Sequence, residues 1–230
     1  MRSTDKRSIH TKGTTENREK YAVEAYRSAS ETLGPIFPGM RKFALTRGQF
    51  GMIDCILHIF DQLGSAHISV WNWGVGKYDI SCLERLLIDD RILSASLLID
   101  ISAKRKDPEI LEYWNARFGA DSVKYIINHA KIARIWNDDL KVLLRGSFNL
   151  NYNPRFENLD ISEGGPEFDL VAEVEAEIPR EDGTSGAAAY AASRLGKAFD
   201  QAKHKQFGTM ELFSCEQKLL DVKGLNTWKA

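Results

Sequence analysis

Short β-forming segments alternate with helical segments over much of this chain, and this alternation constrains its fold more than any other feature. The strand signals are runs rich in β-branched and aromatic residues, as at 66–73 and 95–101. Between them lie segments with apolar residues at helical spacing, as at 52–63 and 108–118. Strands that alternate with helices predict an α/β fold, with a mixed β-sheet flanked by helices on both faces.

The same pattern divides the chain into three parts. Residues 1–20 are polar and mildly basic and predict a disordered arm, residues 21–206 form the expected α/β domain, and residues 207–230 are a C-terminal extension without a clear pattern. A helix is expected over 16–33. Residues 153–158 predict a turn or a helix start before a closing strand.

Composition is that of an ordinary globular protein. The chain has 230 residues, 43% of them hydrophobic and 27% charged, with a net charge of −1. It therefore has no global nucleic-acid signature, and a nucleic-acid enzyme of this kind needs a local basic groove. The three cysteines show no zinc-type spacing and predict reduced thiols in a cytoplasmic protein. Neither a signal-peptide core nor an apolar run of about 20 residues occurs, so no membrane association is expected.

Two pairs of polar residues flank a predicted β-hairpin whose turn, residues 137–139, reads Asn-Asp-Asp. His129 and Lys131 precede it, and in a strand two such residues share a face. Antiparallel register places residue 129 opposite about 148, and 131 opposite about 146. Ser147 and Asn149 then lie at the same level of the hairpin. A nucleophile, a cation and two hydrogen-bonding groups in one small volume are suited to attack on a phosphate ester.

The segments HAK at 129–131 and GSFN at 146–149 together resemble the HKD motif of the phospholipase D superfamily. That motif reads His-x-Lys, a spacer with Asp, then Gly-Ser-x-Asn, and the likeness is closest to small nucleases with one motif per chain. The chain departs from it in the spacer, which is a few residues longer and has Trp136 at the position of the family's Asp. Asp138 either substitutes for that Asp or is only a turn residue.

The resemblance implies a reaction through a phosphohistidine intermediate, without a metal or other cofactor. His129 would attack phosphorus as the nucleophile, and a second histidine would protonate the leaving oxygen. Lys131 and Asn149 would hold the non-bridging oxygens, and Ser147 would hydrogen-bond within the cluster. A downstream carboxylate orients the nucleophile in the family, and Glu157 is the candidate for that role.

A second histidine in a matching motif is missing from the sequence. The chain has five histidines, and of these His129 alone stands in a His-x-Lys segment followed by Gly-Ser-x-Asn. Either the protein is inactive or two chains each supply one motif. A two-fold axis brings the same surface patch of two subunits together. We therefore predict a homodimer with the active site on the symmetry axis.

Two further groups are candidates for contact with nucleic acid. Lys104, Arg105 and Lys106 follow a predicted strand, and loops after strands surround the site in α/β proteins. They either contact nucleic-acid phosphates or form a solvated loop. Trp71 and Trp73 either stack on bases or pack in the core, and the composition of their strand favours packing.

Three functions follow from these expectations. The first is a metal-independent phosphodiesterase that cleaves nucleic acid, with DNA favoured over RNA and an endonuclease as the expected form. The second is a phospholipid phosphodiesterase or phosphatidyl transferase of the same superfamily. The third is a nucleic-acid-binding protein with a degenerate site, which the displaced Asp keeps open.

Overall fold

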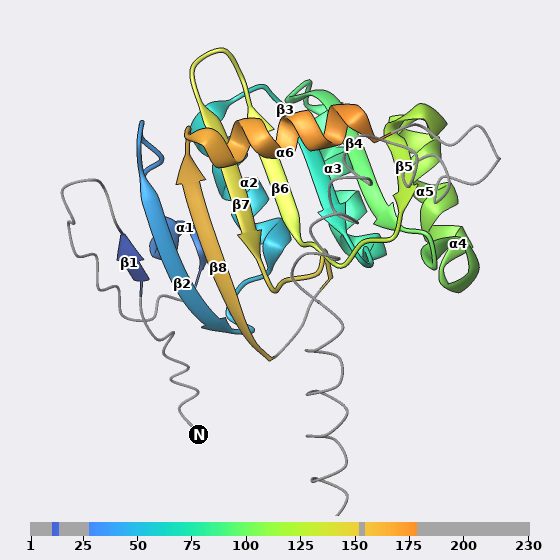
Figure 1. The fold of residues 1–230 in the computed structure, drawn as a ribbon, viewed down its shortest axis with the longest axis horizontal. Helices are drawn as coiled ribbons and strands as arrows, with labels where there is room; N and C mark the ends of the chain where they lie inside the picture. The colour runs from blue at the N-terminus through green and yellow to red at the C-terminus, as the bar shows by residue number, and fades with distance from the viewer. Residues whose placement is uncertain (1–10, 14–27, 152–154, 179–230) are drawn as a thin grey trace, which may run out of the picture. The chain divides into compact units, whose positions relative to one another are not determined.

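The computed structural model describes residues 11–13, 28–151 and 155–178, and these form an α/β fold built on one mixed sheet (Figure 1). The sheet has eight strands in the order β1-β2-β8-β7-β6-β3-β4-β5. Strands β3, β4 and β5 pair in parallel, and every other neighbouring pair is antiparallel. The strands are β1 (Thr11–Gly13), β2 (Arg41–Arg47), β3 (Ala66–Asn72), β4 (Ile92–Asp100), β5 (Val123–Ile126), β6 (Ile132–Trp136), β7 (Lys141–Gly146) and β8 (Phe156–Glu163).

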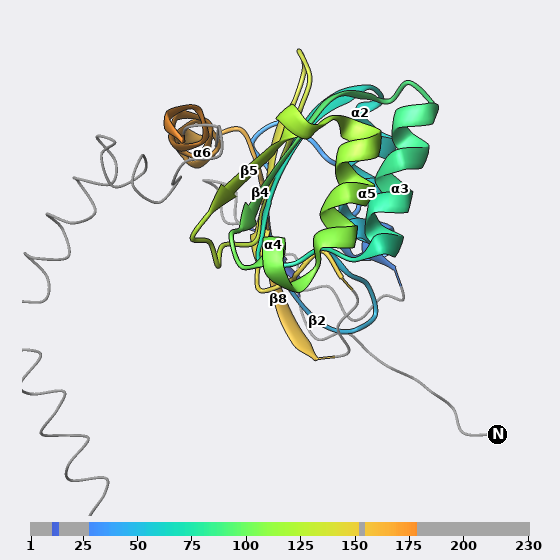
Figure 2. The same cartoon turned by 90° about the vertical axis from the view of Figure 1, so that its right-hand side faces the viewer.

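Helices cover both faces of the sheet, which confirms the expected fold class. Figure 2 shows α2, α3 and α5 on one face and α6 on the other. The helices are α1 (Ala29–Leu33), α2 (Met52–Leu63), α3 (Lys77–Ile88), α4 (Ala103–Lys106), α5 (Pro108–Phe118) and α6 (Pro166–Glu177), with a 3₁₀ turn η1 (Ala120–Ser122) before β5.

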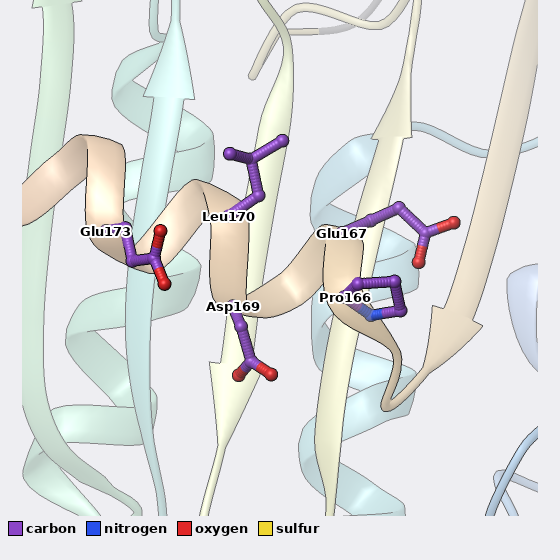
Figure 3. A pocket seen from close by; sticks show the side chains of 5 residues that line it. All are labelled: Pro166, Glu167, Asp169, Leu170 and Glu173. Atoms are coloured by element: carbon purple, nitrogen blue, oxygen red, sulfur yellow. The ribbon is translucent and has the colours of Figure 1, made fainter. Parts of the chain in front are cut away.

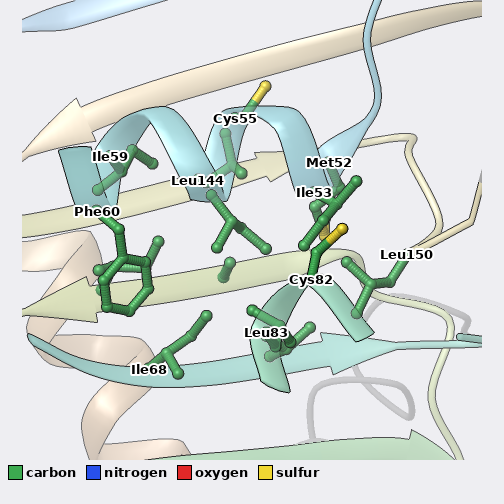
Figure 4. Packing of buried hydrophobic residues seen from close by; sticks show 14 of the residues in the cluster. Met52, Ile53, Cys55, Ile59, Phe60, Ile68, Cys82, Leu83, Leu144 and Leu150 are labelled. Carbon is green, nitrogen blue, oxygen red and sulfur yellow. The ribbon is translucent and has the colours of Figure 1, made fainter. Parts of the chain in front are cut away.

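The main hydrophobic core lies between the sheet and the α2–α3 layer (Figure 4). Helix α2 shows why this layer forms. Its apolar residues recur at helical spacing, so that Ile53, Ile56 and Phe60 are all buried against the sheet. The backbone N–H of Gly51 donates to the Asp54 carboxylate at 2.7 Å, which fixes the first turn. Gly64, at a φ of 73°, ends the helix where the sequence predicted.

Helix α6 is attached to the opposite face by a buried carboxylate. Glu175 accepts hydrogen bonds from Ser69 Oγ (2.6 Å) and Ser96 Oγ (2.8 Å), and it forms an ion pair with Arg134 Nη2 (3.0 Å). The indole N–H of Trp71 also donates to it, at 3.3 Å. Several donors satisfy one buried charge, which is the condition for burying it without a large cost.

Three local expectations are corrected by the structure. Ser28 has an extended backbone and caps α1, so no single helix runs across it to Leu33. The basic residues 104–106 lie in the short helix α4, not in a loop. Glu157 lies in β8, which begins at Phe156, rather than in a turn or a helix start. The predicted closing strand therefore began too late, because this carboxylate occupies the first inward-facing position of β8 and interrupts the apolar alternation.

The expected three-part division of the chain stays a prediction. Residues Thr11–Gly13, within the segment expected to be disordered, form the edge strand β1 on β2. The rest of that segment, the alanine-rich segment 186–205 and the extension 207–230 lie outside the described residues. Cys55 and Cys82 are buried free thiols.

Candidate active site

The residues of the predicted motif lie together at one end of the strands, which we call the site edge of the sheet. Strands β3, β4 and β7 end at this edge, and β6 and β8 begin there, at the lower side of the sheet in Figure 1. His129 and Lys131 lie on the extended segment that leads into β6, not within a strand as expected. Ser147 follows β7 directly, and Glu157 is the second residue of β8.

The hairpin register that the sequence predicted is confirmed. Ile132 pairs with Arg145, and the backbone N–H of Gly146 donates to the carbonyl of Lys131 at 3.1 Å. Residue 131 therefore lies opposite 146. The turn at the far end is held by Asn137, whose side-chain oxygen accepts from the N–H of Leu140 at 2.9 Å.

Asp138 lies in that turn and is exposed. It is seven residue steps along extended chain from Lys131, a distance of roughly 20 Å. Asp138 is therefore a turn residue, and it does not lie next to His129 and Lys131 in place of the motif's Asp. Trp136, at the position of that Asp, stacks on His67 with ring centroids 5.3 Å apart.

The ammonium of Lys131 lies against the imidazole of His129. Its Nζ is 3.1 Å from Nδ1 and 3.2 Å from Nε2, and it donates to the His129 carbonyl at 2.8 Å. An atom equally far from both nitrogens in the ring plane would collide with the carbon between them. The ammonium therefore lies above the plane of the ring. The contact leaves the in-plane position of each ring nitrogen open to another group. His129 is exposed, so a phosphate can approach it.

Lys131 is a buried cation, with only 7% of its surface exposed. Burial lowers the pKa of its ammonium, while the negative charge of Glu157 opposes that shift. A partly desolvated ammonium interacts more strongly with a phosphate oxygen than a solvated one does. Lys131 thus meets the electrostatic requirement for binding a non-bridging oxygen.

Ser147 and Glu157 form a second part of the cluster. The Ser147 hydroxyl donates to the Glu157 carboxylate and accepts from the Asn158 backbone N–H at 3.0 Å. Gly146 makes this close approach of β7 and β8 possible, because a Cβ there would overlap with the backbone oxygen of Asn158. The glycine and serine of the motif therefore position the carboxylate that acts on Lys131.

Asn149 lies on the segment that connects β7 with β8 and that passes beside the start of α3. The neighbouring Leu150 carbonyl accepts from the Gly76 N–H at 2.6 Å, which fixes this segment. The Asn149 side-chain oxygen is buried and has no hydrogen-bond partner within the described part of the chain. An Asn amide also offers two N–H donors of the kind that bind a phosphate oxygen. Its role as a phosphate ligand stays a prediction.

Sequence reasoning missed Asn128, which holds the His129 segment in place. Its side-chain oxygen accepts from the Ala130 N–H at 2.8 Å, and its NH₂ donates to the Asn72 carbonyl at 3.1 Å. Its own backbone N–H donates to Asp100 at 3.0 Å. Burial disfavours the charge of Asp100, but hydrogen bonds from Ser102 and Asn128 outweigh this effect and lower its pKa. An Asn immediately before the His-x-Lys segment was the available signal.

The two tryptophans of the β3 region have different surroundings. Trp71 is buried, as expected, whereas Trp73 follows the strand and is 40% exposed. The Trp73 ring lies beside that of His129, with centroids 6.2 Å apart at 55°. Among the basic residues of α4, Lys106 places its Nζ 4.4 Å from the Trp73 ring centroid, and Lys104 lies over Tyr125 at 4.0 Å. The basic segment thus borders the site through Lys106.

A hollow on α6 lies away from this site (Figure 3). It is lined by Pro166, Glu167, Asp169, Leu170 and Glu173. Helix α6 follows the end of β8, whereas the candidate site is at its beginning. Three carboxylates in its lining disfavour a phosphate.

The described residues show neither a metal-binding cluster nor a membrane-spanning helix. No group of three or more His, Cys, Asp or Glu side chains there is arranged to hold a metal ion. None of the helices within those residues has the length and apolarity needed to span a membrane.

Comparison with known proteins adds little to the geometry. No protein-family model matches the sequence, and no curated protein matches it. Among solved structures, the chain is similar to the phosphatidylserine synthase of Haemophilus influenzae Rd KW20, with 14% identity and a TM-score of 0.41. The similarity covers 84% of this chain and 51% of that one, so the chain spans about half the length of that protein.

Proposed function

We propose that this protein is a phosphodiesterase that works through a covalent intermediate on His129, at a site completed by a second copy of the chain. The observation that carries the proposal is the contact between the exposed His129 ring and the buried Lys131 ammonium, 3.1 Å from Nδ1. Ser147, which follows β7, and Glu157 of β8 support this pair. A nucleophile beside a desolvated cation is the arrangement that attack on an anionic phosphodiester requires.

The reaction proceeds in two steps. A ring nitrogen of His129 attacks phosphorus, an N–P bond forms, and the bond to the leaving oxygen breaks. The partner subunit's His129 gives that oxygen a proton. A water molecule then attacks phosphorus while the partner subunit's His129 takes a proton from it, and the N–P bond breaks. Lys131 and Asn149 bind the non-bridging oxygens, on which negative charge accumulates. Nucleic acid is the substrate that we expect, and phospholipid is the alternative.

The test is to trap the intermediate. The protein is mixed with a labelled oligonucleotide, and separately with phosphatidylglycerol vesicles, in excess chelator, and is quenched in alkali to preserve phosphohistidine. We expect a labelled adduct on His129 by mass spectrometry, and His129→Ala to lose adduct and turnover by about 1000-fold or more.

His67→Ala is the matched control. It removes an imidazole from the second residue of β3, at the end of the strands opposite the candidate site. We expect it to retain turnover and adduct. The proposed mechanism would be contradicted if His129→Ala kept its turnover. It would also be contradicted if the chelator abolished the turnover of the wild-type protein. Product formed from the vesicles but not from the oligonucleotide would identify a phospholipid as the substrate.

A further inference from the structure

Trp73 is an exposed indole next to the nucleophile. Trp71, two residues earlier, is 8% exposed and donates its indole N–H to Glu175. Trp73 lies beyond the end of β3 and exposes 40% of its surface. A large aromatic side chain gains free energy from burial, so its exposure beside His129 is not explained by packing.

The neighbours of Trp73 come from two other segments of the site edge. The His129 ring approaches it with a centroid separation of 6.2 Å, and Lys106 Nζ lies 4.4 Å from its ring centroid. Lys106 is exposed at the end of α4, which follows β4. An aromatic surface and a cation therefore adjoin the atom that would attack phosphorus.

We propose that Trp73 and Lys106 bind the nucleotide that adjoins the scissile phosphate, which makes a nucleic acid the substrate. This inference rests on the proposed role of His129. The base stacks on the exposed part of the indole, and Lys106 contacts the next phosphate along the strand. Every base has a flat π-surface, so such stacking carries affinity without sequence preference.

The same geometry disfavours a phospholipid with a cationic headgroup. Such a headgroup binds an aromatic ring through its face, in a cation–π contact. Lys106 already places a positive charge over the Trp73 ring. A second cation there meets charge repulsion, whereas a neutral base beside an anionic phosphate does not.

Cleavage mapping tests the stacking directly. The substrate is a single-stranded oligonucleotide with one nucleotide that lacks its base. We expect the wild-type protein to cut the phosphates next to the abasic position between about 5-fold and about 100-fold less often than elsewhere. Trp73→Ala should cut all positions at one reduced rate, and Trp73→Phe should restore most of the discrimination.

The control variant is Phe43→Ala, which removes a ring of similar exposure, 41%, from the middle of β2. It should keep the wild-type cleavage map. If Trp73→Ala still discriminates against the abasic position, or if the tryptophan is needed for vesicle cleavage instead, the inference is wrong.

Binding separates this inference from the proposed function. In a His129→Ala background, anisotropy of a fluorescein-labelled oligothymidylate reports affinity without turnover. We expect Trp73→Ala to weaken binding about 10-fold and Phe43→Ala to leave it unchanged. If no variant cleaves any phosphodiester but this difference in affinity is found, the mechanism fails and the nucleotide site stands. Equal affinity of the two variants overturns the nucleotide site.

Discussion

The buried ammonium of Lys131 opposes the stability of the fold. Burial lowers the pKa of this ammonium. A lysine with a lowered pKa in the folded state destabilises the fold fully at pH values where both the folded and the unfolded chain carry the proton, which includes neutral pH. The effect is lost as pH rises above the folded-state pKa towards the ordinary value of 10.5. An apolar side chain of similar length, such as that of Met, avoids this cost of burying a charge.

We therefore expect Lys131→Met to abolish phosphodiester cleavage without unfolding the protein. Urea denaturation at pH 7 should show a stability equal to the wild-type value or higher by about 1 kcal/mol. The gain should shrink as pH rises, because the wild-type lysine then loses its charge. Lys124→Met is the control, since Lys124 Nζ donates to the carbonyls of Glu175 and Ile178. That variant should lose stability, and a similar loss in Lys131→Met would refute the prediction.

At the scale of elements, one buried carboxylate connects α6 to three strands of the sheet. Glu175 collects donors from β3 and β4 and the guanidinium of Arg134 in β6. Burial alone would raise the pKa of Glu175, but the hydrogen bond from Ser69 and the charge of Arg134 outweigh it and lower the pKa. A lowered pKa means that this carboxylate stabilises the fold above its ordinary value of 4.5, and that the effect is lost in acid.

Glu175→Gln should consequently cost about 3 kcal/mol of unfolding free energy at pH 7, because it leaves the buried Arg134 without its counter-ion. The difference from the wild-type protein should diminish as pH falls below about 4. Glu173→Gln, an exposed carboxylate on the same helix, is the control and should change little. Denaturant titrations at several pH values measure both variants, and a pH-independent difference would contradict the ionic account.

Elements with a regular apolar pattern could be predicted from the sequence, and those interrupted by functional residues could not. Helices α2 and α5 begin and end at the predicted residues. Glycines flank α2 at both ends, whereas α5 begins at Pro108 and ends before Gly119. Strand β8 was placed too late because Glu157 occupies an inward-facing position. The hairpin register followed from its turn, but the bracing of His129 by Asn128 depends on contacts between distant strands, which one sequence does not reveal.

For the whole molecule, the central expectation is that one chain holds half of an active site. Light scattering should give twice the chain mass of 26.0 kDa. When equal amounts of wild-type and His129→Ala chains are unfolded and refolded together, only dimers with two intact histidines should act. Activity should then fall to about a quarter, whereas independent sites would retain about a half. Wild-type chains mixed with His67→Ala chains should keep full activity.

The direction of β6 and β7 has a practical consequence. Their turn, with the exposed Asp138 and Asp139, lies at the edge of the sheet opposite His129. A cysteine introduced at Asp139 would give a handle for attaching the protein to a sensor surface. Molecules immobilised through that turn would present the His129 edge to the solution, so that nucleic-acid capture could be followed on oriented rather than randomly coupled protein.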